Sequence, residues 1–293
     1  MNPVAFQIGP FAVHWYGILI VGGALLAAYI ATIEAKRRGE NPDHAWDALA
    51  LCLLFGIIGA RLYHVLSIPE GCTPETLYPC GWYWYRRHPI DAIAFWHGGF
   101  RGLAIYGAVA GGVLAVFVYT RYAKLNFLRW LDIGAPGLIL TQAIARWGNY
   151  INQELYGPPT DLPWGIYISP AHRLPGLEAY ERFHPVFFYE SVWNLLGFIV
   201  LMYIGRRFAS RLLDGDVFFL YAIWYPFGRF FLEFLRPDAW KIGNIATAQI
   251  IAVASIVISL VLIIYRHRRA RLAPQPASSE ASSQTDQECH CEE

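Results

Sequence analysis

A stripe of polar side chains crosses an otherwise apolar stretch in the last third of the chain. The stripe consists of Tyr225, Arg229, Glu233 and Arg236, at spacings of four, four and three residues. Residues three and four apart share one face of an α-helix, so we expect these side chains to line one helix face. An arginine inside an apolar span is costly unless it finds a partner or water. Glu233 can neutralise one arginine and leave the other for an anionic ligand, although a purely structural ion-pair network is the alternative.

A second polar group begins at Arg146 and continues through Asn149 and Asn152 to Glu154. If this segment is helical, Arg146, Asn149 and either Asn152 or Gln153 share one face at the end of an apolar run. A guanidinium presents a planar fork of N–H donors to two oxygens, so with neighbouring amides it suits a phosphate. Helix capping would explain Asn149, but it leaves Asn152 and Glu154 unexplained.

Two further segments can be explained by structure rather than by ligand binding. Arg61 lies in an apolar run with His64 one turn away, and it could reach the interface or pair with an acid instead of binding a ligand. Gly107 and Gly111 form a pair of small residues four apart, which predicts close helix packing. Tyr106 would then be presented into a tight space between two helices.

The elements that carry these residues must lie in a membrane. The chain is 56% hydrophobic and only 15% charged, whereas soluble domains are about 25% charged. Eleven tryptophans and eighteen tyrosines suit the aromatic belts of membrane interfaces. A net charge of +1 gives no support to a nucleic-acid partner.

Apolar runs long enough to cross a bilayer predict an all-α polytopic membrane protein with about seven transmembrane helices. The predicted spans are 11–33, 46–66, 103–122, 131–147, 185–204, 217–235 and 245–265. The first run is too long for the apolar region of a cleaved signal peptide, so we expect it to be retained. Residues 1–272 would form one transmembrane catalytic domain, and the Ser/Gln/Glu-rich residues 273–293 a disordered tail.

Basic residues then predict the orientation in the membrane. They gather at 36–38, 121–129, 206–211 and 266–271, and with seven spans all four clusters fall on one side. The positive-inside rule makes that side cytoplasmic. The N-terminus is then outside and the C-terminus inside, and the loops 67–101 and 148–184 form an outer region of the kind where membrane enzymes place substrate contacts.

The cysteines and the short motifs limit the kinds of reaction that the sequence supports. Cys72 and Cys80 share one outer loop and could pair there in an oxidising compartment. Cys289, His290 and Cys291 could bind a metal, but a lone Cys-His-Cys at a chain end is a weak signal. H-E-x-x-H, G-x-S-x-G and P-loop motifs do not occur, so zinc hydrolysis, serine nucleophilic catalysis and ATP use gain no support.

Five segments, in order, resemble motifs of the bacterial phosphatidylglycerol–prolipoprotein diacylglyceryl transferase family, and the resemblance covers nearly all of the chain. They are 9–17 (GPFAVHWYG), 96–107 (WHGGFRGLAIYG), 146–157 (RWGNYINQELYG), 184–190 (HPVFFYE) and 228–238 (GRFFLEFLRPD). The segment 146–157 resembles the family signature R-x-G-N-F-x-N-x-E-x-x-G. This chain departs from the family at Tyr106, where many members have His, and at Phe187, where Gln is common.

The resemblance implies a reaction and its participants. Phosphatidylglycerol would supply a diacylglyceryl group to the lipobox cysteine of a prolipoprotein in the bacterial inner membrane, with release of glycerol-1-phosphate and without metal, nucleotide or redox cofactor. The implied catalytic residues are Arg146, Arg229, Tyr225, Glu154 and Tyr106. The implied phosphatidylglycerol-binding residues are Arg146, Asn149, Asn152, Gly157, Tyr16, His14, Glu233 and Arg236. Glu154, Tyr106 and His14 remain alternatives for the group that polarises the thiol.

Two other kinds of protein would also place arginines at membrane depth. A transporter or flippase for anionic lipids would move its substrate without covalent change, but such proteins usually have internal repeats, and none is visible in this sequence. A structural subunit of a membrane complex would leave the cluster 146–157 unexplained.

Overall fold

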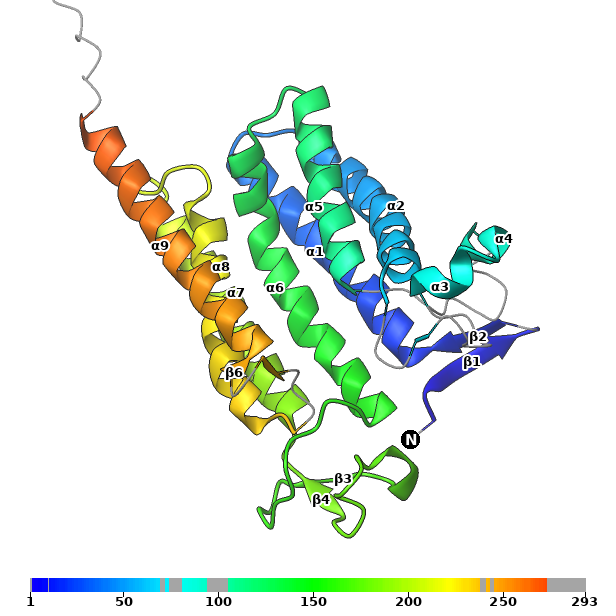
Figure 1. Ribbon diagram of the computed structural model, residues 1–293. Helices are drawn as coiled ribbons and strands as arrows, with labels where there is room; N and C mark the ends of the chain where they lie inside the picture. Colours follow the sequence, from blue (N-terminus) through cyan, green and yellow to red (C-terminus); the bar gives the residue numbers. More distant parts are fainter. Residues whose placement is uncertain are drawn as a thin grey trace, which may run out of the picture.

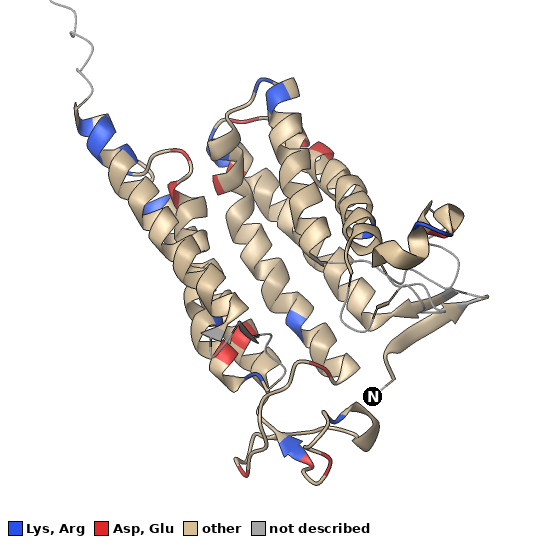
Figure 2. Cartoon of the chain, viewed as in Figure 1, with Lys and Arg blue, Asp and Glu red and all other residues tan. Residues whose placement is uncertain are grey.

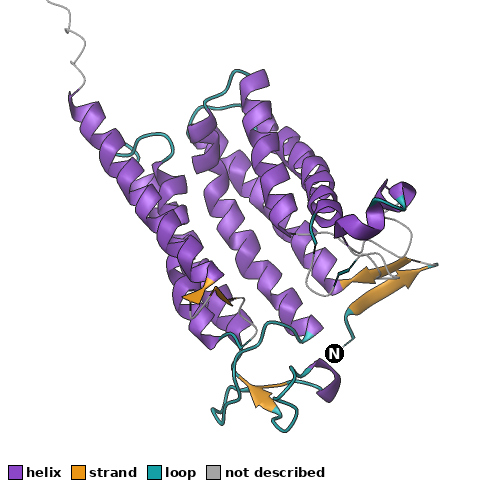
Figure 3. Ribbon diagram, viewed as in Figure 1, coloured by secondary structure: helices purple, strands orange, loops and turns teal. Residues whose placement is uncertain are grey.

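The protein is a bundle of long helices with three small hairpins (Figures 1 and 3). The computed structural model describes residues 2–9, 11–68, 72–73, 81–93, 105–237, 241–242 and 245–272. Its long helices are α1 (Trp15–Arg37), α2 (Asp43–Leu66), α5 (Ile105–Tyr122), α6 (Phe127–Asn152), α7 (Val186–Arg207), α8 (Asp216–Leu232) and α9 (Thr247–Leu272). The short helical segments are α3 (Gly81–Tyr85), α4 (Pro89–Ile93), η1 (Pro170–His172) and η2 (Glu233–Leu235).

Each predicted span overlaps one long helix, and the chain is a mostly helical membrane protein. By length and apolarity, α1, α2, α7 and α9 can cross a bilayer. Only 6% of the apolar window of α2 is buried inside the protein, so its side chains face outward as expected in lipid. The count of seven spans stays a prediction.

The ends of two predicted spans were wrong. Residues 11–14 do not begin a helix but form β2 (Phe11–His14), which pairs antiparallel with β1 (Val4–Ile8). Residues 245–246 form β6 (Ile245–Ala246) opposite β5 (Lys241–Ile242). A short apolar run has the same appearance in a strand as at the end of a helix, so the sequence pattern could not separate them.

Glycines bring α2 and α5 into contact. A Cβ atom at Gly107 would lie 2.0 Å from the carbonyl oxygen of Gly59, and one at Gly111 would lie 2.1 Å from that of Phe55. The predicted close packing of the two glycines is confirmed. The predicted position of Tyr106 was wrong, because this side chain is 63% exposed. Successive helical residues point about 100° apart, so with Gly107 against α2 the side chain of Tyr106 lies at the edge of this contact, where its ring meets that of Tyr63.

The centre of the bundle is α6, which contacts α1 on one side and α7 and α8 on the other. Asn126 caps its N-terminus by accepting hydrogen bonds from the backbone nitrogens of Leu128 and Arg129. Thr141 donates a hydrogen bond to the carbonyl of Gly23 in α1 (2.7 Å). These contacts fix the helix that carries Arg146.

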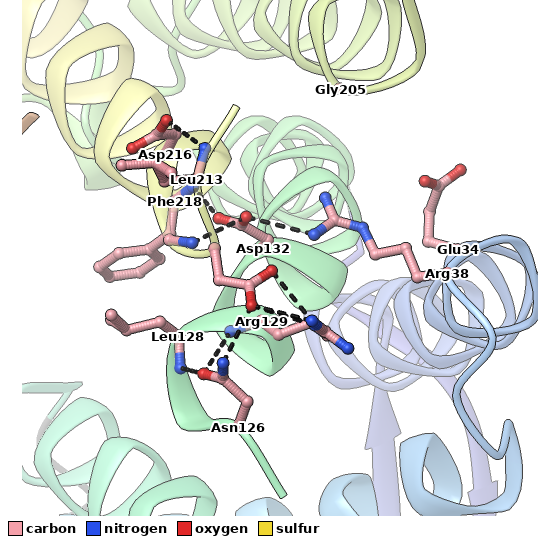
Figure 4. Close-up of polar contacts among 12 residues, drawn as sticks. Glu34, Arg38, Asn126, Leu128, Arg129, Asp132, Gly205, Leu213, Asp216 and Phe218 are labelled. Atoms are coloured by element: carbon pink, nitrogen blue, oxygen red, sulfur yellow. Dashed lines mark hydrogen bonds and ion pairs between the residues drawn. The ribbon is translucent and has the colours of Figure 1, made fainter. Parts of the chain in front are cut away.

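Most of the lysines and arginines of the helices gather at one end of the bundle (Figure 2). At this basic end, Arg38, the residue directly after α1, pairs with Asp132 of α6 (3.2 Å). Asp132 also accepts hydrogen bonds from the backbone nitrogens of Gly215 and Phe218 at the start of α8 (Figure 4). The network therefore ties α1, α6 and α8 together.

A cavity of about 300 Å³ lies at this basic end. Its charged lining includes Arg38, Arg129 and Asp214. Arg129 pairs with both Glu40 and Asp214, so its charge is balanced within the protein. The cavity is thus part of the structural ion-pair network.

The loops predicted to lie outside have structure of their own. Between α6 and α7, β3 (Ile166–Tyr167) pairs with β4 (Arg182–Phe183), and Tyr156, Ile168 and Phe183 form a small buried core beside them. Arg61 donates a hydrogen bond to the carbonyl of Ala92 (2.9 Å), in agreement with a structural role.

Several predictions concern residues that the structure does not describe. Cys72 is in a disulfide, whereas Cys80 lies outside the described residues. The same is true of most of the motif at 96–107 and of the tail 273–293 with its Cys-His-Cys group.

Candidate active site

Two arginines on different helices pair with one carboxylate on a third helix. Arg146 of α6 lies with its Nη2 atom 2.6 Å from Oε1 of Glu190 in α7. Arg229 of α8 lies with its Nη1 atom 3.5 Å from Oε2 of the same Glu190. The two arginines, far apart in sequence, therefore flank a single acidic side chain, and we call these three residues the arginine site.

The predicted polar stripe continues from Arg229. Its Nη2 atom lies 2.8 Å from Oε2 of Glu233, and Nη1 of Arg236 lies 3.8 Å from the same oxygen. The α-helix ends at Leu232 and the chain continues as the short helix η2, yet the spacing keeps all three charged groups together. The expected pairing of Glu233 with an arginine is confirmed.

Exposure differs between the acids and the bases of this cluster. The side chains of Glu190 and Glu233 are 4% and 3% exposed, whereas those of Arg146 and Arg229 are 22% and 16% exposed. The two carboxylates are therefore buried, and part of each arginine side chain reaches the surface. Such a guanidinium can offer N–H donors to an incoming anion while the buried acid fixes its position.

Tyr225 adds a hydroxyl to the same cluster. Its oxygen accepts a hydrogen bond from Nη2 of Arg146 (3.4 Å), and its ring stacks on Tyr221, one turn earlier in α8, with 6.1 Å between centroids. The sequence predicted Tyr225 and Arg229 on one face of a helix. The structure adds that this face meets Arg146.

A second carboxylate is held at the end of α6. Glu154 accepts hydrogen bonds through one oxygen from the side-chain nitrogens of Asn149 (2.9 Å) and Asn152 (3.2 Å). Gln153 adopts the left-handed conformation (φ 55°) that ends the helix, and the chain folds Glu154 back toward it. The predicted helix face of Arg146 and Asn149 is present, but the Asn149 amide binds Glu154.

Tyr16 is a neighbour of both Arg146 and Glu154. A Cβ atom at Gly148 would lie 2.2 Å from the Tyr16 ring, so glycine allows the ring to lie directly on α6. The Tyr16 hydroxyl interacts electrostatically with both Glu154 and Arg146. The structure thus brings Tyr16, Arg146 and Glu154 into one region.

Gly157 has a clear packing role. A Cβ atom there would lie 2.8 Å from Cβ of His184 and 3.1 Å from the carbonyl oxygen of Leu235. The backbone nitrogen of Gly157 also donates to the carbonyl of His184 (2.9 Å). Only glycine fits where the segment after α6 passes between the start of α7 and the end of η2.

Two predicted site residues have other contacts in the structure. Tyr106 contacts Tyr63 of α2, with ring centroids 5.9 Å apart. His14 ends β2 and is paired with Val4. Within the described ranges, no hydrogen bond or ion pair joins Tyr106 or His14 to the arginine site.

Glu190 is the site residue that sequence reasoning missed. It belongs to the segment 184–190, which resembled a family motif, but Glu233 was the only partner considered for the arginines. Phe187, at the position where Gln is common in the family, stacks on Tyr150 of α6 with 4.7 Å between ring centroids. Glu190 could have been predicted from its position inside an apolar span, since an acid there needs a cationic partner.

Comparison with known proteins identifies the family of this chain. A family model described as prolipoprotein diacylglyceryl transferase matches residues 3–265. A phosphatidylglycerol–prolipoprotein diacylglyceryl transferase of Chloroflexus aggregans is 42% identical over 281 residues, covering 89% of this chain and 87% of the relative. Proteins of the same name from Streptococcus equi subsp. zooepidemicus (39% identical, covering 92% of this chain and 96% of the relative) and Streptococcus agalactiae (36%, covering 93% and 99%) are similar too. The chain therefore belongs to the prolipoprotein diacylglyceryl transferase family.

Proposed function

We propose that this protein transfers the diacylglyceryl group of phosphatidylglycerol to the lipobox cysteine of prolipoproteins, a step of lipoprotein biosynthesis. The observation that carries the proposal is the arginine site, in which Arg146 and Arg229 from two helices flank the buried Glu190. Family membership supplies the reaction, and the site supplies cationic groups suited to the phosphate of the lipid.

The reaction exchanges one bond for another. The cysteine thiolate attacks the carbon of the diacylated glycerol that carries the phosphate. A carbon–sulfur bond forms, and the bond between this carbon and the phosphate oxygen breaks. The electron pair of that bond leaves with glycerol-1-phosphate, and the thiol proton passes to a base. The protein must therefore hold the phosphate, stabilise the charge of the leaving group and accept one proton.

The two arginines have different roles toward the phosphate. Arg229 is held from both sides by Glu190 and Glu233, so its guanidinium is fixed before the substrate arrives. Fixed donors that face developing charge stabilise a transition state most effectively. Arg146 is held by Glu190 and Tyr225, at the end of α6, where it binds the phosphate of the incoming lipid.

Glu154 is the base that the geometry favours for the thiol proton. Its carboxylate is oriented by Asn149 and Asn152, and it shares Tyr16 as a neighbour with Arg146. A free thiol has a pKa near 8.5, so the reaction needs a carboxylate that accepts the thiol proton and a positive charge, here Arg146, that stabilises the thiolate. Tyr106 lacks such a position.

We place the protein in the bacterial inner membrane with seven spans, the N-terminus outside and the C-terminus in the cytoplasm. Basic residues gather at one end of the bundle (Figure 2), whereas Arg146, Glu190 and Arg229 lie near the end of α6, the start of α7 and the end of α8. This separation supports the orientation. The arginine site then lies toward the outer leaflet, where a lipobox follows its signal peptide.

The experiment that tests the function is a mass measurement. The purified protein is incubated in nanodiscs with phosphatidylglycerol and a lipobox peptide, and the same peptide with serine in place of cysteine is the control. The expected result is a mass gain of one diacylglyceryl group on the cysteine peptide only. Lipid movement between leaflets without a modified peptide would favour a transporter and contradict the proposal.

A further inference from the structure

A proline lies inside α8, between two residues of the polar stripe. Pro226 directly follows Tyr225 and stands three residues before Arg229. Proline has no backbone N–H, so the carbonyl four residues earlier, that of Ala222, loses its partner within the helix. Proline is also one of the few causes of a sharp bend in a helix. The last turn of α8, which carries Arg229, can therefore differ in direction from the turns before Pro226.

The neighbouring helix α9 supplies the missing hydrogen-bond donor. The hydroxyl of Ser255 in α9 donates to the carbonyl of Ala222 (2.9 Å), and α9 packs along α8 (Figure 1). In the hydrocarbon region of a membrane, water does not bind a carbonyl that proline has freed, so a neighbouring helix must do so. Ser255 therefore replaces the donor that Pro226 lacks.

Two more side chains bind carbonyls of α8 on either side of the proline. Before it, the indole nitrogen of Trp193 in α7 donates to the carbonyl of Trp224 (3.0 Å). After it, Nε2 of Gln249 in α9 donates to the carbonyl of Phe230 (3.3 Å), close to the end of the helix. Helices α7 and α9 thus hold the backbone of α8 around Pro226, and the direction of the last turn depends on these contacts.

That direction decides how Arg229 meets the other helices. Its contact with Glu190 crosses from α8 to α7 at 3.5 Å, whereas its contact with Glu233 stays within the same segment. The contact between Arg146 and Glu190 joins α6 to α7 and involves no part of α8. A change in the bend at Pro226 would therefore move Arg229 relative to Glu190 and leave Arg146 in place.

We propose that Ser255 is a positioning residue for Arg229. By binding the carbonyl of Ala222 it sets the bend of α8 at Pro226, and this bend places the Arg229 guanidinium where the charge of the leaving group develops. The inference rests on the proposed function, in which Arg229 acts on that charge. The effect of Ser255 on the reaction passes through the position of Arg229.

The test measures kcat and KM for phosphatidylglycerol in thioether formation, in nanodiscs. A catalytic group misplaced by about 1 Å can cost about a hundredfold in rate, so Ser255→Ala should lower kcat about tenfold or more. KM should change less than about twofold, because Arg146 still binds the phosphate. Ser255→Thr keeps the hydroxyl and should restore most of the wild-type kcat.

The matched control is Ser259→Ala, one turn further along α9. Ser259 is also buried, but within the described residues its side chain makes no hydrogen bond to α8. The substitution removes the same hydroxyl from the same helix and should leave kcat and KM near those of the wild type. A loss of kcat equal to that of Ser255→Ala would overturn the role of the bond to Ala222.

Two double variants test the path of the effect. Pro226→Ala returns a backbone N–H that can bind the Ala222 carbonyl, so in this background Ser255→Ala should lower neither the melting temperature nor kcat appreciably further. In the Arg229→Ala background, Ser255→Ala should lower kcat no further.

Several outcomes would overturn the positioning role. One is a folded Ser255→Ala with the wild-type kcat, and another is an effect that multiplies independently in either background. If Ser255→Ala alone does not fold, its combination with Pro226→Ala should fold, and failure of this double variant would also overturn the role. Absence of any thioether from the wild type would instead overturn the proposed function, and the role of Ser255 with it.

Discussion

At the scale of single residues, Glu190 holds two arginines together in one site by pairing with both of them. Replacement by Gln removes the charge that Arg146 and Arg229 share and leaves two like charges facing each other. Breaking a buried ion pair typically costs about 3–5 kcal/mol. We expect Glu190→Gln to lower both the melting temperature and the rate of thioether formation.

The control for this variant is Glu178→Gln, which makes the same chemical change at an exposed loop residue and should resemble the wild type in both measurements. A Glu190→Gln protein that folds and transfers lipid at the wild-type rate would show that the arginines do not need their shared carboxylate.

The candidate bases can be separated by their positions. Glu154→Gln keeps an oxygen that can accept from Asn149 and Asn152 but loses basicity, so the fold should persist. Loss of a general base typically lowers the rate about a hundredfold or more. Tyr106→Phe should leave the rate near that of the wild type, because Tyr106 is exposed and its ring contacts Tyr63 of α2. Single-turnover rates of both variants check the assignment, and the opposite ranking would refute it.

At the scale of the elements, the contact between α2 and α5 depends on glycine. In Gly111→Ala the new Cβ atom would lie 2.1 Å from the carbonyl oxygen of Phe55, so the two helices must move apart. Overpacking of this kind typically costs about 1–3 kcal/mol. We expect a lower melting temperature for Gly111→Ala.

The matched variant is Gly112→Ala, where nothing lies within 4 Å of the new atom and alanine favours the helix. Its melting temperature should equal or exceed that of the wild type. Equal destabilisation by both substitutions would mean that the contact between α2 and α5 is not the cause.

Local spacing was sufficient to predict much of this architecture. The stripe from Tyr225 to Arg236 depends only on residues three and four apart, so the sequence predicted correctly that its charged groups gather, although the α-helix ends at Leu232. Glu190 joins residues of three helices, and no local pattern connects these helices. The direction of Tyr106 also required a partner helix, because only the contact between Gly107 and Gly59 decides which face of α5 is turned toward α2.

At the scale of the whole molecule, the charges predict the orientation in the membrane. Basic residues in the last turns of α1, α5, α7 and α9 gather at one end, and that end should face the cytoplasm. Reporter fusions after Arg38 and after Arg211 should both give cytoplasmic signals. A fusion after Gly176, in the segment between α6 and α7, should give an outside signal. A periplasmic signal from the Arg38 fusion would reverse the proposed topology.

The central claim is that Arg146 and Arg229 together handle the phosphate of the lipid. The most direct test measures thioether formation on the lipobox peptide as a function of phosphatidylglycerol concentration, for Arg146→Ala, Arg229→Ala and Arg229→Lys in nanodiscs. Arg229→Ala should lower kcat about a hundred- to a thousandfold, as expected for a donor that acts in the transition state, and Arg146→Ala should chiefly raise KM. Arg229→Lys should remain impaired, because lysine lacks the planar fork. If all three folded variants transfer lipid like the wild type, the phosphate is bound elsewhere.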